Sequence, residues 1–133
     1  MFLDFAHIAF LEHRMTTNNV EVHKRLHADG ELRSEWTTIN GKKEGVARIW
    51  HKNGRLFSEA TFRDGLTQGV IREWNEAGCL TLEAHVVDGQ YHGSYQAFFD
   101  DGAVWKRGIK SMDKSLPGFI EYRPDGSVFH VVE

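Results

Sequence analysis

The sequence predicts an all-β protein, an elongated and twisted antiparallel sheet made of stacked β-hairpins. The first observation behind this prediction is that glycine recurs every 24 residues in three columns along most of the chain. The columns are Gly30, Gly54, Gly78, Gly102 and Gly126, then Gly41, Gly65 and Gly89, and finally Gly45, Gly69 and Gly93. A fixed period of this length indicates a repeat architecture.

The second observation is that turn-forming dipeptides separate the short apolar segments. They are Asn40-Gly41, Asn53-Gly54, Asp64-Gly65, Asp88-Gly89, Asp101-Gly102 and Asp125-Gly126. Such pairs tolerate the positive φ angles of two-residue type I′ turns, whose twist matches that of the flanking strands. Ala77-Gly78 fits this pattern less well, because alanine disfavours a positive φ.

Two kinds of strand are expected to alternate between these turns. The first kind is predicted at residues 22–26, 46–50, 70–74, 94–98 and 118–122, and the second kind at residues 31–39, 55–63, 79–87, 103–111 and 127–132. In the last unit the internal turn gives way to residues 112–116 and Pro117. The repeat is therefore expected to end there.

Residues 1–19 stand outside the repeat and are predicted to cap it, whereas residues 20–133 form the hairpin array. Phe2, Phe5, Ala6 and Phe10 follow a helical spacing, so a short amphipathic helix is the first interpretation and an added edge strand the second. Either would protect the open end of a sheet, where backbone groups lack a neighbouring strand.

If each dipeptide is the centre of a two-residue turn, the register follows by counting. Arg48 then faces Glu59, and Trp50 faces Phe57. The same rule pairs Lys24 with Glu35, Arg72 with Glu83, Phe98 with Trp105 and Tyr122 with Phe129. Cross-strand ion pairs and aromatic pairs each contribute roughly 0.2–1 kcal/mol, so several together would hold the register.

One face of the predicted sheet therefore carries a stripe of large rings between the ion pairs. The stripe consists of Trp50, Phe57, Trp74, Phe98, Trp105, Tyr122 and Phe129. These rings either pack on their neighbours or dock another protein, since exposed aromatic patches with polar rims are typical of interfaces. A single layer of strands cannot cover both of its faces with one short segment, which favours docking.

Composition excludes several classes of function. The net charge of −3 and the pI near 6.2 provide no positive surface for nucleic acid or anionic lipid. The single cysteine, Cys79, cannot form an internal disulfide and suits a reducing compartment. No segment is long and apolar enough to span a membrane. A cytoplasmic location is therefore expected.

The sequence contains no set of residues that would converge on a catalytic site, so an enzyme is not expected. His85 and His92 would face each other across the Asp88-Gly89 turn, the one pair with a geometry suited to a metal ion. A third ligand is not evident, so no metal or other cofactor is expected.

The unit at residues 53–78 resembles the MORN-variant repeat of bacterial antitoxin-like and immunity-like proteins. The matching features are the apolar residue two places after the turn glycine, the glutamates at 35, 59 and 83, and the aromatic residue that closes each first strand. The resemblance spans about residues 20–130, and the last unit departs from it at Arg107, Asp113 and Pro117. It implies a sheet of hairpins that serves as a binding scaffold.

We therefore expect a non-enzymatic module that binds and neutralises or regulates another protein, such as a toxin or a nuclease-type effector. The seven rings of the stripe would form the interface, and homodimerisation is left open. The alternative is a membrane-associated or oligomeric scaffold, which the acidic charge balance disfavours for lipid binding.

Overall fold

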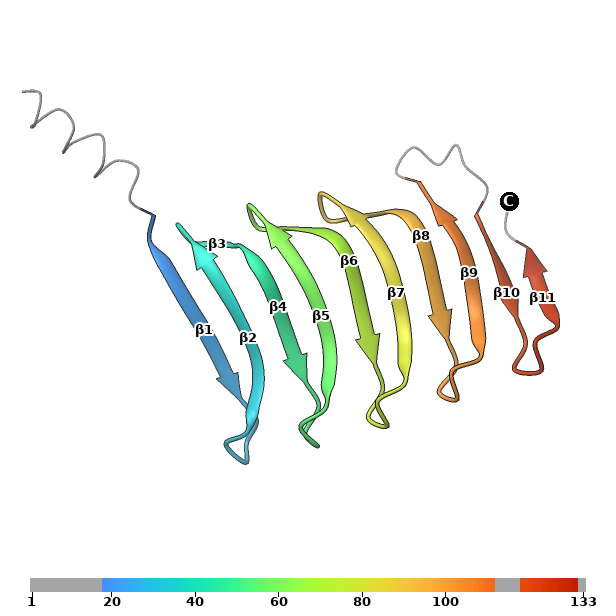
Figure 1. Cartoon of the computed structure of the whole chain (residues 1–133), viewed down its shortest axis with the longest axis horizontal. Helices are drawn as coiled ribbons and strands as arrows, with labels where there is room; N and C mark the ends of the chain where they lie inside the picture. The colour runs from blue at the N-terminus through green and yellow to red at the C-terminus, as the bar shows by residue number, and fades with distance from the viewer. Residues whose placement is uncertain (1–17, 112–117, 132–133) are drawn as a thin grey trace, which may run out of the picture.

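The computed structural model describes residues 18–111 and 118–131, and it confirms the all-β class. These residues form one open antiparallel sheet in which consecutive hairpins lie side by side along the long axis of the molecule (Figure 1). The strand order follows the chain, and only the short β3 lies off the main path, paired with β2. The expected cap lies outside the described residues except for Asn18 and Asn19.

The strands keep the predicted alternation, with most ends differing by no more than two residues, but β6 and β8 each begin four residues earlier than predicted. They are β1 (Val20–Leu26), β2 (Leu32–Ile39), β3 (Lys42–Lys43), β4 (Gly45–Trp50), β5 (Leu56–Arg63), β6 (Leu66–Trp74), β7 (Leu80–Val87), β8 (Gln90–Phe98), β9 (Val104–Lys110), β10 (Phe119–Tyr122) and β11 (Val128–Val131).

At one end of the hairpins the predicted type I′ turns are confirmed. Asn40, Asp64 and Asp88 have φ angles of 51°, 50° and 48°, and the glycine after each also has a positive φ. A type I′ turn requires positive φ at both central residues, which is why Asn or Asp precedes Gly here.

At the other end of the hairpins the prediction of type I′ turns is wrong. Gly54 has a positive φ of 85°, but Asn53 does not. The Gly54 N–H donates to the His51 carbonyl at 3.0 Å, and the His51 N–H donates to the Arg55 carbonyl at 2.8 Å. The same two bonds recur in the loops that end at Gly30, Gly78, Gly102 and Gly126. Each is a three-residue loop built on a type I turn and closed by a glycine bulge.

The extra loop residue changes the pairing next to the loop. Trp50 pairs with Leu56 instead of Phe57, because the register shifts between Ile49 and Trp50. Phe98 pairs with Val104, and Tyr122 with Val128, instead of Trp105 and Phe129. The predicted aromatic pairs are therefore wrong by one residue.

Farther from the loop the predicted ion pairs are confirmed. Lys24 pairs with Glu35, Arg48 with Glu59, and Arg72 with Glu83. Neighbouring hairpins continue the row, since Glu35 also pairs with Arg48, and Glu59 with Arg72. We call the row Lys24, Glu35, Arg48, Glu59, Arg72 and Glu83 the charge ladder, and the side of the sheet that carries it the ladder face.

The opposite side, which we call the groove face, holds the small core of the sheet. Ala84 and Val86 of β7, Ala97 of β8 and Thr38 of β2 are the buried residues of the described chain. No large side chain among the described residues is fully buried. A single layer leaves water close to both faces, so most of its stability must come from contacts between neighbouring strands.

Candidate functional site

The charge ladder occupies the middle of the ladder face. Arg48 Nε lies 2.8 Å from Glu59 Oε2, and Arg72 Nε lies 2.7 Å from Glu83 Oε2. The Lys24 Nζ–Glu35 Oε2 distance is 4.0 Å. The repeated glutamates therefore neutralise the repeated cations and specify the strand register.

The seven residues of the predicted stripe lie along the three-residue loops, beside the charge ladder. Side chains alternate between the two faces of a strand, so Trp50, two residues after Arg48, projects from the ladder face, as does Trp74 after Arg72. Trp105 is 44% exposed and Phe129 62% exposed. The other members, Trp50, Phe57, Trp74, Phe98 and Tyr122, are half-buried. We call this set the aromatic stripe.

Cationic and polar groups border several rings of the stripe. The Arg107 guanidinium lies 5.8 Å from the centre of the Tyr122 ring and donates to the Tyr122 hydroxyl at 3.3 Å. The Arg123 guanidinium lies 5.3 Å from the Phe129 ring. Cation–π contacts at exposed sites contribute about 0.5–1 kcal/mol. The C-terminal part of the stripe therefore combines apolar area with positive charge.

Side chains in the first three of the three-residue loops tie each loop to the next hairpin. His27 Nε2 lies 3.0 Å from the Trp50 carbonyl oxygen, and one repeat later His51 Nε2 lies 2.8 Å from the Trp74 carbonyl oxygen. The Asn53 side-chain amide donates to the Glu76 carbonyl at 2.8 Å. No role was predicted for these two histidines, although they lie 24 residues apart, which is the period of the repeat.

His85 and His92 do not form a ladder pair. Val86 pairs with Tyr91, and the register then shifts, so that Ala84 pairs with Tyr95 and His85 has no direct partner in β8. Both histidines are exposed. The part of the chain that the structure describes contains no group of three or more His, Cys, Asp or Glu that could hold a metal.

The groove face carries a hollow of about 510 Å³, which was not predicted from the sequence. Its floor is formed by the small residues Ser34, Ala47, Ser58 and Ala60, which belong to three successive strands of the sheet, β2, β4 and β5. The Trp36 and Phe62 rings, Ile49, and the Arg25 and Lys43 side chains also line it on this face, and the charged residues Arg33, Glu35 and Arg48 border it.

The two cations of the hollow lie over its rings. The Arg25 guanidinium is 5.3 Å and the Lys43 ammonium 5.4 Å from the centre of the Trp36 ring. Lys43 is also 4.9 Å from the centre of the Phe62 ring. Both cations are exposed, so solvent and ligands reach them.

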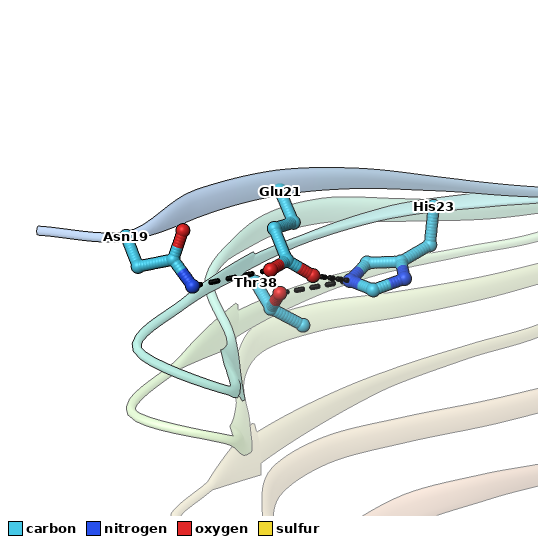
Figure 2. Close-up of polar contacts among 4 residues, drawn as sticks. All are labelled: Asn19, Glu21, His23 and Thr38. Carbon is cyan, nitrogen blue, oxygen red and sulfur yellow. Dashed lines mark hydrogen bonds and ion pairs between the residues drawn. The ribbon is translucent and has the colours of Figure 1, made fainter.

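A chain of polar contacts fixes the His23 ring, which stacks on Trp36 (Figure 2 shows Asn19, Glu21, His23 and Thr38). The His23 ring stacks on Trp36 with the ring centres 5.1 Å apart and the planes at 7°. His23 Nε2 lies 2.8 Å from Thr38 Oγ1 and 3.7 Å from Glu21 Oε2, and the Asn19 amide donates to Glu21 at 3.1 Å. The hollow therefore has a pre-oriented aromatic wall.

Farther along the groove face, Lys110 lies over two tyrosine rings, 4.1 Å from the centre of Tyr95 and 4.9 Å from that of Tyr91. Burial lowers the pKa of Lys110, and the neighbouring Lys106 lowers it further. Burial raises the pKa of Tyr91, with smaller contributions from Tyr95 and Glu73. This half of the groove face is more closely packed than the hollow, because it holds the buried residues Ala84, Val86 and Ala97.

Comparison with known proteins does not place the chain in a family. No family model matches it, and no curated protein matches it significantly. Within the described residues no helix is long and apolar enough to cross a membrane. The resemblance to the MORN-variant repeat therefore depends on the sequence features alone.

Proposed function

We propose that the protein is a non-enzymatic, MORN-variant-like binding module that docks another protein on its aromatic stripe and thereby neutralises or regulates it. The observation that carries the proposal is that a one-layer sheet leaves all seven rings of the stripe incompletely buried. Large rings that a fold leaves open, next to paired charges, are the usual anchors of protein interfaces.

The surface is suited to tight binding because it is already ordered. The charge ladder and the loop histidines hold the stripe before any partner arrives. Association then costs less conformational entropy than binding by a mobile loop. The proposed mechanism is steric: the sheet covers the active surface of the partner and requires no chemical step.

The second candidate function is an oligomeric scaffold. Both end strands expose apolar side chains, Val20, Val22 and Leu26 on β1 and Val128, Phe129 and Val131 on β11. Exposed edge strands pair readily with other strands, so end-to-end association of copies is the competing arrangement.

The test uses the full-length protein as bait in an extract of the native host, with substitutions on each face. Trp105→Ala and Phe129→Ala remove the two most exposed rings of the stripe, and each is expected to weaken capture of the partner at least tenfold. Tyr91→Ala is the matched control, since Tyr91 is 42% exposed but lies on the groove face. Circular dichroism verifies that each variant folds.

The outcome separates the two candidates. A partner that remains bound to both stripe variants would refute the stripe as the interface. Sedimentation of the purified protein as a concentration-dependent series of oligomers, with no other protein captured, would favour the scaffold instead.

A further inference from the structure

We propose that the hollow on the groove face is a second binding site, and that it takes an extended acidic peptide segment of another protein. The fitting segment places a carboxylate next to an aromatic or aliphatic side chain. None of the seven residues of the aromatic stripe lines this site, so the inference does not depend on the proposed function.

The hollow carries positive charge that no carboxylate compensates. Every cation of the charge ladder has a glutamate partner, whereas Arg25 and Lys43 have no carboxylate within ion-pair distance among the described residues. Both lie above the same Trp36 ring, at 5.3 and 5.4 Å from its centre. An incoming carboxylate would therefore meet two cations without displacing an existing ion pair.

The shape of the hollow suits an extended peptide segment. Small side chains at Ser34, Ala47, Ser58 and Ala60 let an extended segment approach the sheet closely. A volume of about 510 Å³ is within the range of specific ligand pockets. Trp36, Phe62 and Ile49 supply apolar walls for a side chain that follows the carboxylate.

The hollow lies where the first hairpin departs from the repeat. Trp36 stands in the column that later holds Ala60 and Ala84, and Lys43 in the column that later holds Thr67 and Tyr91. In the later units this face packs closely, and Ala84 is fully buried. The sheet does not need Trp36 and Lys43 at these positions, because the later units form with other residues there.

The aromatic wall of the site is already oriented before a ligand binds. The His23 ring stacks on Trp36, and Thr38, Glu21 and Asn19 hold His23 in turn (Figure 2). A fixed aromatic wall reduces the entropy that a bound peptide would have to compensate.

The chemistry favours a peptide over a nucleic acid. A polyanion requires many cations along its backbone, and this protein has a net charge of −3, with Glu35 as well as four cations around the hollow. One or two carboxylates match Arg25 and Lys43, and the rings account for the apolar part.

The test selects peptides from a displayed library of random decapeptides on the immobilised full-length protein. We expect enrichment of sequences that combine Asp or Glu with a neighbouring Phe, Leu or Trp. One enriched peptide is then synthesised with a fluorescent label, and its Kd is measured by anisotropy. A matched peptide with Asn and Gln in place of Asp and Glu is expected to bind at least tenfold more weakly.

Variants of the protein locate the site. Lys43→Gln and Arg25→Gln are each expected to weaken binding about tenfold, the loss of one charge-assisted contact. Lys52→Gln, the same charge change in an exposed loop, should leave the Kd unchanged, as should Trp105→Ala, because neither residue lines the hollow. Trp36→Ala should abolish binding, and the two glutamine variants keep the test valid if that variant fails to fold.

Several results would overturn the proposal. Enrichment without acidic residues, or binding unaffected by Lys43→Gln and Arg25→Gln, would show that the hollow is not an acidic-peptide site. Binding that appears only after residues 1–17 are removed would identify that segment of the chain as the occupant. Lys43-dependent sedimentation with phosphatidylserine vesicles, without peptide enrichment, would identify a membrane surface instead.

Discussion

At the scale of single residues, the charge ladder is the feature that the sequence alone located most accurately. Arg72 pairs in the sheet with Glu59 on one side and with Glu83 on the other. Only the Arg72–Glu83 contact is short, at 2.7 Å, and both side chains are more than one-third exposed. Solvent therefore limits what the pair contributes.

A double-mutant cycle on Arg72→Gln and Glu83→Gln measures this contribution. We expect a coupling free energy of about 0.5 kcal/mol in urea denaturation, because exposed cross-strand pairs typically contribute 0.2–1 kcal/mol. The coupling should decrease in 1 M salt, where exposed charges are screened within about 3 Å. Arg63→Gln, at an exposed position without an ion pair in the described chain, should show no coupling to Glu83→Gln.

Tyr91 offers a test by pH. Its raised pKa means that the phenol ionises above the ordinary value of 10.0, and the difference in ultraviolet absorbance between the protein and Tyr91→Phe should show this. The folded state retains the proton that the unfolded state has already lost. The free energy of unfolding should therefore fall as the pH rises above 10.0, and Tyr91→Phe should lack that part of the fall. A midpoint at or below 10.0 would contradict the burial of this side chain.

At the scale of elements, type I′ turns alternate along the chain with three-residue loops closed by a glycine bulge. One of these three-residue loops shows how alanine is tolerated before the glycine. In the other three-residue loops an Asn or Asp before the glycine accepts the N–H two residues later, as Asn53 does from Arg55 at 2.9 Å. The Ala77 side chain has no acceptor atom, and the Asn75 side chain accepts the Cys79 N–H at 2.9 Å instead. Ala77 fits because its position in a type I turn needs no positive φ.

Asn75→Ala should therefore destabilise the protein by about 0.5–1.5 kcal/mol, since the Cys79 N–H loses its side-chain acceptor. Adding Ala77→Asp should restore most of this loss, because it supplies the acceptor that the other loops use. Thermal and urea unfolding of the single and double variants provide the measurement. Ala77→Asp with no recovery in the Asn75→Ala background would mean that the loop depends on the bond from Asn75 to Asp100 instead.

At the scale of the whole molecule, the described strands form a linear array in which each strand makes its extensive contacts with the strands beside it (Figure 1). The buried residues Ala84 and Val86 lie in β7, and Ala97 lies in β8. Local stability in such an array follows the local burial.

Hydrogen exchange should follow this gradient. Amide protection is expected to be highest in β7 and β8 and to decrease toward β1 and β11, whose side chains are almost all exposed. Mass spectrometry of exchanged peptides measures the profile. Uniform protection along the sheet would indicate a single cooperative unit instead of an array.

Deletion of one period tests the array directly. Removing residues 55–78 joins Gly54 to Cys79 and keeps the loop, the strand direction and the phase of the repeat. The shortened chain should retain β-sheet circular dichroism with a lower Tm, because one set of neighbour contacts is lost. Removing residues 55–66 shifts the phase by half a period and should prevent cooperative unfolding.

The sequence alone determined the period, the strand order and the middle of each register. Glycine spacing carries the period, and the Arg–Glu pairs identify the register wherever strands meet away from the loops. Asn-Gly and Asp-Gly, however, fit both a type I′ turn and a type I turn with a glycine bulge. Counting residues could not distinguish them, so the pairing of Trp50 with Leu56 was missed.

The tertiary structure decided what each face presents. The hollow draws on Arg25, Trp36, Lys43 and Phe62, which belong to β1, β2, β3 and β5, so no local pattern could bring them together. Whether they meet depends on which face each side chain takes and on the bulges that adjust the register. The physical reason is that periodicity is a property of neighbours along the chain, whereas a binding surface is made by side chains that only strand pairing places side by side.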